Sequence, residues 1–177
     1  MKPAVAMGLA MVGALGVAIA YAQGQAPKPG PELKKLEYFV GTWSSEGEMK
    51  PSPFGPGGKF TGTEHIEWMD GDFFLVGHAE GDSSMGHEKS LSVWGYDADK
   101  KVYTYHAFNS MGEAISATGT AAGDSWNWTS EETMAGKLMR SRYTIKTASP
   151  TSYTFKLEMQ PEGGEWGTMM EGKASKK

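Results

Sequence analysis

The sequence predicts an all-β domain, an antiparallel sandwich or barrel of about ten strands preceded by one short helix. Apolar and polar residues alternate with a period of two from Gly41 onward, as they do in strands that bury one face. Clusters of Gly, Pro, Asp and Ser interrupt this alternation roughly every 8 to 12 residues, which is typical of antiparallel sandwiches and barrels. The chain contains no cysteine, so burial of a patterned core must supply the stability that disulfides give many small domains.

Nine turn signals separate the expected strands. They lie at residues 51–58, 69–72, 81–86, 97–100, 110–112, 122–124, 134–136, 148–150 and 161–164. Short connections of this kind join antiparallel neighbours, so about ten strands should follow one another around a single sheet.

The only helix that the pattern favours lies at residues 32–40. Its apolar residues form one stripe, at Leu33, Leu36 and Val40. Gly41 follows as a residue that tolerates positive φ and can end a helix. Trp43 then lies at the start of the first expected strand.

The first 22 residues have the composition of a secretory signal peptide. Lys2 precedes a long uncharged stretch, and Ala20-Tyr21-Ala22 forms a small-x-small cleavage site. An uncleaved membrane anchor is the alternative, because residues 3–22 approach the length of a bilayer span. Their many Ala and Gly residues favour cleavage instead. We therefore expect an exported protein, periplasmic or secreted, with a flexible linker at 23–31 and a barrel domain at 32–177.

Two hairpins can be placed on faces from the alternation. A two-residue turn at Asp70-Gly71 would pair Ile66 with Leu75 and define one drier face that should point inward. That face carries Phe60, Gly62, Glu64, Ile66, Trp68, Phe73, Leu75, Gly77 and Ala79. Its mixture of large residues and glycines suits a lumen that is partly open. In the next hairpin, with a loop at 97–100, Trp94 shares a face with Tyr105 while His106 lies on the other, and both faces are apolar enough to point inward.

The order of these motifs resembles a known bacterial family. The segments are L-x-x-F-V-G-T-W at 36–43, MDGDFFLVGH at 69–78, VWGYDADKKVY at 93–103, NSMG at 109–112 and GGEWGTMMEGK at 163–173. Together they resemble the family called domain of unknown function 1579, over nearly the whole chain from Leu33 to Lys173. The resemblance implies a closed or nearly closed calycin or lipocalin-like barrel, with the helix capping one end and the ring of Trp43 plugging that closed end. The other end would admit a small apolar or amphipathic molecule.

Two features depart from better-known relatives of this group. Lipocalins often place an arginine from a late strand over the Gly-x-Trp tryptophan, whereas here the last strand offers Lys173 and the arginines lie two strands earlier. Nitrobindin-like proteins bind haem through a histidine late in the chain, and this chain has no histidine after His106. We therefore expect no haem and no other cofactor.

The candidate ligand-binding residues combine one inward acid with rings and bases that could surround it. They are Glu64, Trp94, Tyr105, His106, Trp128, Arg140 and Arg142. A buried carboxylate is costly without a partner, so Glu64 should meet Arg140, Arg142, a tyrosine hydroxyl or trapped water. Trp126 and Trp128 lie on the same face of one strand and could line a cavity wall. Large rings also fill ordinary cores, and a structural ion pair is the commoner role for such an acid.

Several other classes of site are disfavoured. His65 and His78 share the outward face with nearby acids, but exposed polar residues are far commoner than a metal site, which usually fixes three or four ligands. The segment starting at Asp97 lacks the glycine and final glutamate of a calcium loop. A formal net charge of −4 without a basic run disfavours a phosphate-binding surface, so we expect no nucleic-acid partner.

Three functions remain open from the sequence. The leading one is an exported barrel that holds a small hydrophobic or amphipathic ligand in its lumen. The second is an enzyme that uses the cavity for acid/base chemistry through Glu64, His106 or Tyr105. The third is a filled barrel that acts through its surface or dimerises by a sheet edge.

Overall fold

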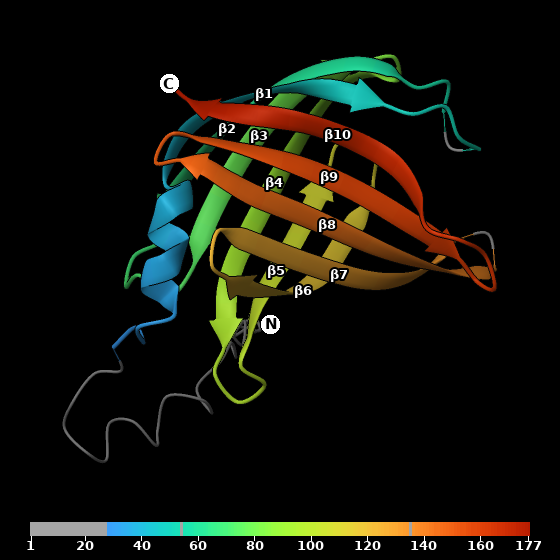
Figure 1. Cartoon of the computed structure of the whole chain (residues 1–177). Helices are drawn as coiled ribbons and strands as arrows, with labels where there is room; N and C mark the ends of the chain where they lie inside the picture. Colours follow the sequence, from blue (N-terminus) through green and yellow to red (C-terminus); the bar gives the residue numbers. More distant parts are fainter. Residues whose placement is uncertain (1–27, 54, 135) are drawn as a thin grey trace, which may run out of the picture.

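Each alternating segment forms a strand, and the strands close on themselves. This computed structural model describes residues 28–53, 55–134 and 136–177. The described residues form one 3-10 helix, η1, and ten strands (Figure 1). Their bounds are η1 Leu33–Phe39, β1 Gly41–Met49, β2 Gly58–Trp68, β3 Leu75–Ser83, β4 Gly86–Asp97, β5 Val102–Asn109, β6 Ala114–Ala122, β7 Ser125–Met134, β8 Lys137–Ser149, β9 Ser152–Pro161 and β10 Gly167–Lys176. The prediction of an all-β barrel of about ten strands with one short helix is confirmed.

The predicted signal peptide, residues 1–22, lies outside the described residues, as does most of the predicted linker at 23–31. Within the part of the chain that the structure describes, no helix is both long enough and apolar enough to cross a membrane.

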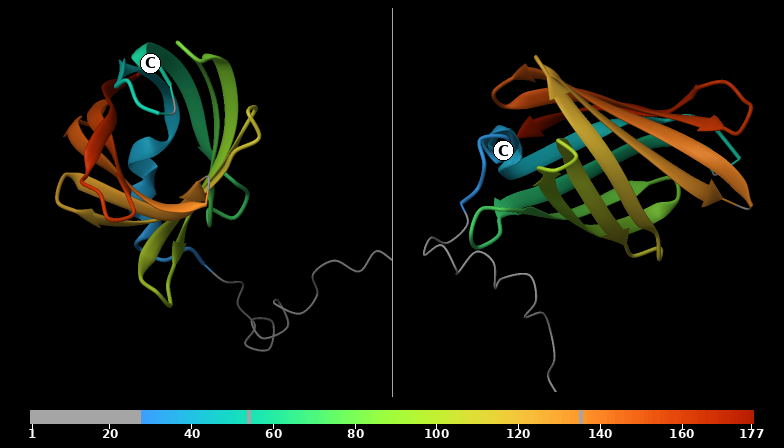
Figure 2. Two further views of the ribbon diagram at one scale, coloured as in Figure 1. Left: turned by 90° about the vertical axis from the view of Figure 1, so that its right-hand side faces the viewer. Right: turned by 90° about the horizontal axis from the view of Figure 1, so that it is seen from below.

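The barrel is closed by its first and last strands. Every strand pairs antiparallel with its neighbours in the sequence, and β1 also pairs with β10. This last ladder runs from Trp43 opposite Lys176 to Met49 opposite Met170. Figure 2 (left) looks along the barrel from the end opposite η1 and shows the strands as a ring around the helix. Because the described strands form a complete ring, they leave no edge for the sheet-edge dimer that the sequence allowed.

The hairpin of β2 and β3 has the predicted faces but another register. Trp68 lies opposite Leu75 and Ile66 lies opposite Gly77, so the predicted pairing is displaced by two residues. The connection is longer than an Asp-Gly turn, because the Met69 backbone N–H donates to Phe74 O at 2.8 Å. A shift of two keeps every side chain on its side of the sheet. The inward face was therefore predicted correctly although the turn was wrong.

The hairpin of β4 and β5 resolves the choice that the sequence left open. Trp94 lies opposite Tyr105 and Tyr96 lies opposite Tyr103. Trp94 and Tyr103 are buried, so this face points into the barrel. His106 follows Tyr105 on the strand, so its side chain points the opposite way and is exposed on the outside.

The helix closes one end of the barrel with a stripe of three-residue period. Leu33, Leu36 and Phe39 are buried, whereas the predicted stripe ended at Val40. A 3-10 helix places residues i and i+3 in line, which explains why Phe39 replaces Val40. Val40 is already extended, with φ −61° and ψ 134°. Gly41 has φ 121°, as expected of the residue that ends the helix.

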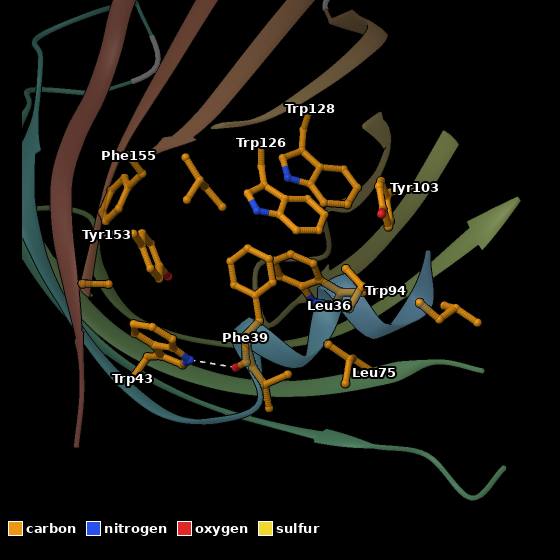
Figure 3. Packing of buried hydrophobic residues seen from close by; sticks show 14 residues of the cluster. Leu36, Phe39, Trp43, Leu75, Trp94, Tyr103, Trp126, Trp128, Tyr153 and Phe155 are labelled. Atoms are coloured by element: carbon orange, nitrogen blue, oxygen red, sulfur yellow. Dashed lines mark hydrogen bonds between the residues drawn. The ribbon is translucent and has the colours of Figure 1, made fainter. Parts of the chain in front are cut away.

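Trp43 forms the plug at this closed end, where Figure 3 shows it among the other buried rings. Its Nε1 donates a hydrogen bond to Phe39 O at 2.7 Å, which ties the first strand to the helix. The Lys176 ammonium lies 5.1 Å from the centre of the Trp43 ring and donates to Tyr38 O at 3.1 Å. Lys176 therefore supplies the cation over this tryptophan, while Lys173 forms an exposed ion pair with Glu46.

Candidate functional site

A cavity of about 380 Å³ lies inside the barrel, on the side of the buried rings away from η1. Side chains from β2 and from β4 to β10 line it. Its walls are mainly apolar and aromatic, and include Met139, Ile145, Leu157, Met159 and Met170. Its polar groups include the Glu64 carboxyl group and the hydroxyls of Tyr105, Tyr143 and Tyr153. The volume falls within the range of small-molecule sites, about 300 to 1,000 Å³.

Glu64 enters this cavity from β2 and is held by a short chain of hydrogen bonds. Trp94 Nε1 donates to Ser92 Oγ at 2.9 Å, and Ser92 Oγ donates to Glu64 Oε1 at 3.2 Å. Since Ser92 Oγ accepts the hydrogen bond from the indole N–H, its own hydroxyl proton is directed at the carboxyl group. This chain fixes one oxygen of Glu64. The other oxygen, Oε2, has no hydrogen-bond partner among the described residues.

The glycine at position 77 makes room for this arrangement. A Cβ added to Gly77 would lie 2.4 Å from Ser92 Oγ and 2.5 Å from Glu64 Oε1. Any larger residue would therefore displace the hydrogen bond between them. The carboxyl group rests against β3 because that strand lacks a side chain at this point.

The surroundings of Glu64 disfavour its charged form. Burial raises the pKa of the Glu64 carboxyl above its ordinary value, and the hydrogen bond from Ser92 opposes this in part. No arginine, lysine or histidine lies among the described residues that line the cavity. The acid therefore has one hydroxyl donor and no cation.

Three tyrosines bring hydroxyl groups into the same cavity. Tyr105, Tyr143 and Tyr153 come from β5, β8 and β9, and none of their hydroxyls has a hydrogen-bond partner among the described residues. Burial raises the pKa of all three, and the negative charge of Glu64 raises it further. These tyrosines remain protonated at neutral pH, so each can both donate and accept a hydrogen bond.

Trp128 adds a buried donor without an acceptor. Its side chain is 4% exposed, and its Nε1 has no hydrogen-bond partner in the described part of the chain. The ring stacks on Trp126 with centroids 6.4 Å apart and meets Trp94 edge-on at 5.4 Å (Figure 3). It lies against Gly119, where an added Cβ would be 2.5 Å from ring atom Cε3. A buried N–H left unpaired costs about 1 to 3 kcal/mol, so the position of Trp128 is maintained by the packing of its ring and not by a hydrogen bond.

Four of the seven predicted site residues line the cavity: Glu64, Trp94, Tyr105 and Trp128. His106 does not; it is exposed, with Nδ1 3.0 Å from Ser116 Oγ. Arg140 is also outside, where its Nε donates to Glu131 at 2.6 Å.

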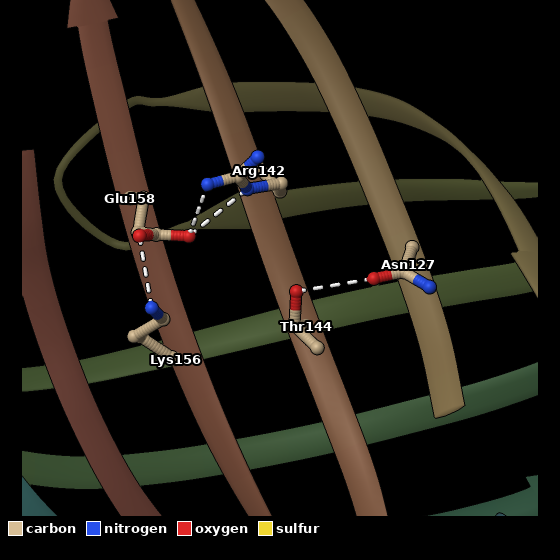
Figure 4. Close-up of polar contacts among 5 residues, drawn as sticks. All are labelled: Asn127, Arg142, Thr144, Lys156 and Glu158. Atoms are coloured by element: carbon tan, nitrogen blue, oxygen red, sulfur yellow. Dashed lines mark hydrogen bonds and ion pairs between the residues drawn. The ribbon is translucent and has the colours of Figure 1, made fainter. Parts of the chain in front are cut away.

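Arg142 lies on the outer face of the barrel too. Its Nε and Nη2 donate to Glu158 Oε2 at 2.9 and 2.7 Å, and Lys156 donates to the other oxygen at 2.9 Å (Figure 4). The predicted pairing of Glu64 with Arg140 or Arg142 is therefore wrong. Both arginines occupy even positions of β8, whereas the odd positions 139 to 145 point inward.

The sequence reasoning missed Ser92, Tyr143 and Tyr153. Tyr143 lies directly opposite Trp128 across β7 and β8. Extending the inward assignment of Trp128 through the turn at 134–136 would have placed Tyr143 on the same face. Among the described residues, no group of three or more His, Asp or Glu side chains is arranged to hold a metal ion. His65 and His78 do face one another on neighbouring strands, but only as a pair.

Comparisons with known proteins agree on the fold. The crystal structure of Rv2717c from M. tuberculosis aligns with a TM-score of 0.58 at 13% identity, over 84% of this chain and 98% of that chain. The S-type phycobiliprotein lyase CPES from Guillardia theta aligns with a TM-score of 0.54 at 12% identity, over 81% and 90% of the two chains. At such identities the likeness shows the fold alone.

Comparison with family models identifies the family of this chain, which the structural likeness does not. No curated protein matches this chain. The family model described as a protein of unknown function, DUF1579, matches residues 28–176. The resemblance drawn from the motifs is thereby confirmed, and this chain belongs to the DUF1579 family of proteins of unknown function.

Proposed function

We propose that this protein is an exported binding protein that holds a small hydrophobic or amphipathic molecule in the barrel lumen. The observation that carries the proposal is the cavity of about 380 Å³, which combines an apolar lining with polar groups that no described residue satisfies. The tyrosine hydroxyls and Glu64 Oε2 are available to water or a ligand, and a lumen with aromatic walls favours a ligand with a large apolar part. Export rests on the signal-like sequence of residues 1–22.

Binding is a better account of this site than catalysis. The acid/base alternative relied on Glu64, His106 or Tyr105, and His106 lies outside the barrel. Burial raises the pKa of Tyr105 further above its ordinary value, which makes its hydroxyl a poorer acid and keeps the tyrosinate base inaccessible at neutral pH. A filled barrel is less consistent with the cavity than either alternative.

Native mass spectrometry of protein purified from its own host tests this proposal. We expect a species heavier than the polypeptide by one small molecule, which is released on denaturation. Ala117 lines the cavity from β6, so the ring of Ala117→Phe should occupy part of the lumen and reduce retention. Thr118→Phe, on the exposed face of the same strand, is the matched control and should retain the molecule. Equal retention by both variants, or no retained molecule in the unmodified protein, would count against a luminal ligand.

A further inference from the structure

The charges in the lumen all have one sign. Glu64 and Glu132 are the carboxylic acids among the described residues that line the cavity, and no basic side chain lines it. Arg140 and Arg142 pair with acids on the outside. Lys176 is engaged at the closed end by the Trp43 ring and Tyr38 O. An anionic ligand would therefore meet carboxylates and no cation to balance it.

The geometry of Glu64 leaves one oxygen ready for a ligand. Ser92 occupies Oε1, and the Trp94 indole fixes the direction in which Ser92 donates. Oε2 has no partner in the described part of the protein. A carboxylate in such a position is stabilised by a cation or by further donors. Gly77 leaves room for the hydrogen bond between Ser92 and Oε1, because a Cβ at that position would lie 2.5 Å from Oε1.

Trp94, Tyr105 and Trp128 line the same cavity as Glu64, and Trp94 contacts the other two rings edge to face. Trp94 meets Tyr105 at 5.0 Å with planes 87° apart, and meets Trp128 at 5.4 Å with planes 89° apart. The negative faces of aromatic rings attract a cation within about 6 Å of the ring centre. The free hydroxyl oxygens of Tyr105, Tyr143 and Tyr153 can also accept hydrogen bonds, and an ammonium group has three donors to offer.

We infer that the lumen selects a hydrophobic amine, a molecule with an apolar body and an ammonium group that pairs with Glu64, and that it rejects anionic amphiphiles such as fatty acids. This inference rests on the proposed function and specifies its ligand class. The apolar body occupies the part of the cavity lined by Met139, Leu157 and Met159. The ammonium group donates its three hydrogen bonds to Glu64 Oε2 and to two of the tyrosine hydroxyls.

Three probes with one ring system and different charges test the inference. They are naphthylmethylamine, naphthylmethanol and naphthoate, titrated at pH 7 into the purified protein by isothermal calorimetry. The amine should bind most tightly and the carboxylate most weakly. Glu64→Gln should weaken binding of the amine by about tenfold to a hundredfold, the range expected for one hydrogen bond to a charged group, and leave the alcohol within about twofold. Retained binding of the alcohol shows that the variant is folded.

Glu67→Gln is the matched control, because Glu67 lies on the same strand but is exposed on the outer face. It should leave all three affinities unchanged. If naphthoate binds as tightly as the amine, or if Glu64→Gln leaves the amine unaffected, selection of a cation is wrong while luminal binding stands. If none of the probes binds, the proposed function fails together with the inference.

Discussion

Two glycines on ordinary backbone shape the cavity by the side chains they lack. Gly77 leaves room for the contact between Glu64 and Ser92, and Gly119 leaves room for the flat face of Trp128. Neither position needs a positive φ, so the requirement comes from close approach of a neighbouring side chain. The inward face at 62–79 was predicted to mix glycines with large residues, and the structure gives that mixture its physical reason.

Gly119→Ala should force the Trp128 ring out of its position. An added Cβ would lie 2.5, 2.7 and 2.9 Å from three ring atoms, so the ring or β6 must move. We expect a loss of about 1 to 3 kcal/mol in the free energy of unfolding and a changed near-ultraviolet circular dichroism spectrum. Gly167→Ala is the control, since a Cβ added there would meet nothing within 4 Å and its φ is ordinary. Urea denaturation should show little change for that variant, and an equal loss in both would contradict the steric argument.

Among the elements, η1 is a seven-residue helix whose stability comes from the barrel. An isolated helix of this length does not persist in water. Phe39 extends from it to within 5.1 Å of the Trp94 and Trp126 rings, and Leu36 is fully buried. The helix therefore connects Trp43 to Trp94, which lines the cavity. Packing of η1 against the barrel supports the position of that ring.

Phe39→Ala should loosen the packing of η1 against the barrel. Removing a buried phenylalanine side chain lowers the free energy of unfolding by about 3 to 5 kcal/mol. Lys34→Ala, on the exposed side of the same helix, should cost little. Urea denaturation followed by tryptophan fluorescence measures both. A loss for Phe39→Ala no greater than that for Lys34→Ala would show that η1 contributes little to the core.

The strands also show where sequence patterns stop being informative. Alternation assigned the inward faces of β2 and β3 correctly, because a period of two survives an error of two in register. Alternation along β8 alone did not show which of its residues point inward, because that depends on the pairing through the turn at 134–136. Arg140 and Arg142 were therefore offered as partners of Glu64, although both lie outside. Within one strand, the phase is decided by the neighbours on both sides. For β8 those are Trp128 on β7 and Leu157 on β9, both opposite Tyr143.

For the molecule as a whole, closure of the ring is what buries Glu64. The Glu64 carboxyl group shares the cavity with Tyr105, Tyr143 and Tyr153, which come from strands far apart in the sequence. Burial raises the pKa of these tyrosines, and the negative charge of Glu64 raises it further. No local segment of the chain would produce this surrounding. The cost of an ionised Glu64 is therefore a property of the assembled barrel.

Glu64→Gln should change how stability depends on pH. Burial raises the pKa of Glu64 in the folded state above the ordinary 4.5, so the ligand-free protein binds this proton more tightly folded than unfolded. The contribution of Glu64 is then most favourable below pH 4.5 and is lost as pH rises through the folded-state pKa. The glutamine variant lacks this loss. Relative to the unmodified protein, it should gain stability as pH increases from 4.5 and then level off.

Thermal or urea unfolding at a series of pH values measures this difference. Other shifted carboxyls, such as Glu158, are present in both proteins and cancel in the comparison. Glu67→Gln should follow the unmodified protein across the range. A constant difference between Glu64→Gln and the unmodified protein at every pH would mean that Glu64 has the same pKa folded and unfolded.

Patterns along the chain were enough to establish the class of fold, the strand count, the helix before Gly41 and the inward side of the first hairpin. These features follow from local alternation and turn chemistry, which neighbouring residues encode directly. Three features emerged only in the folded barrel. They are the register of β2 against β3, the burial of Phe39 instead of Val40 in the helix stripe, and the position of the Lys176 ammonium over the Trp43 ring. The folded barrel also placed Ser92, Tyr143 and Tyr153 around Glu64 and turned His106 and both arginines outward. Those outcomes depend on which side chains meet across a closed ring, and ring closure joins residues that no local pattern relates.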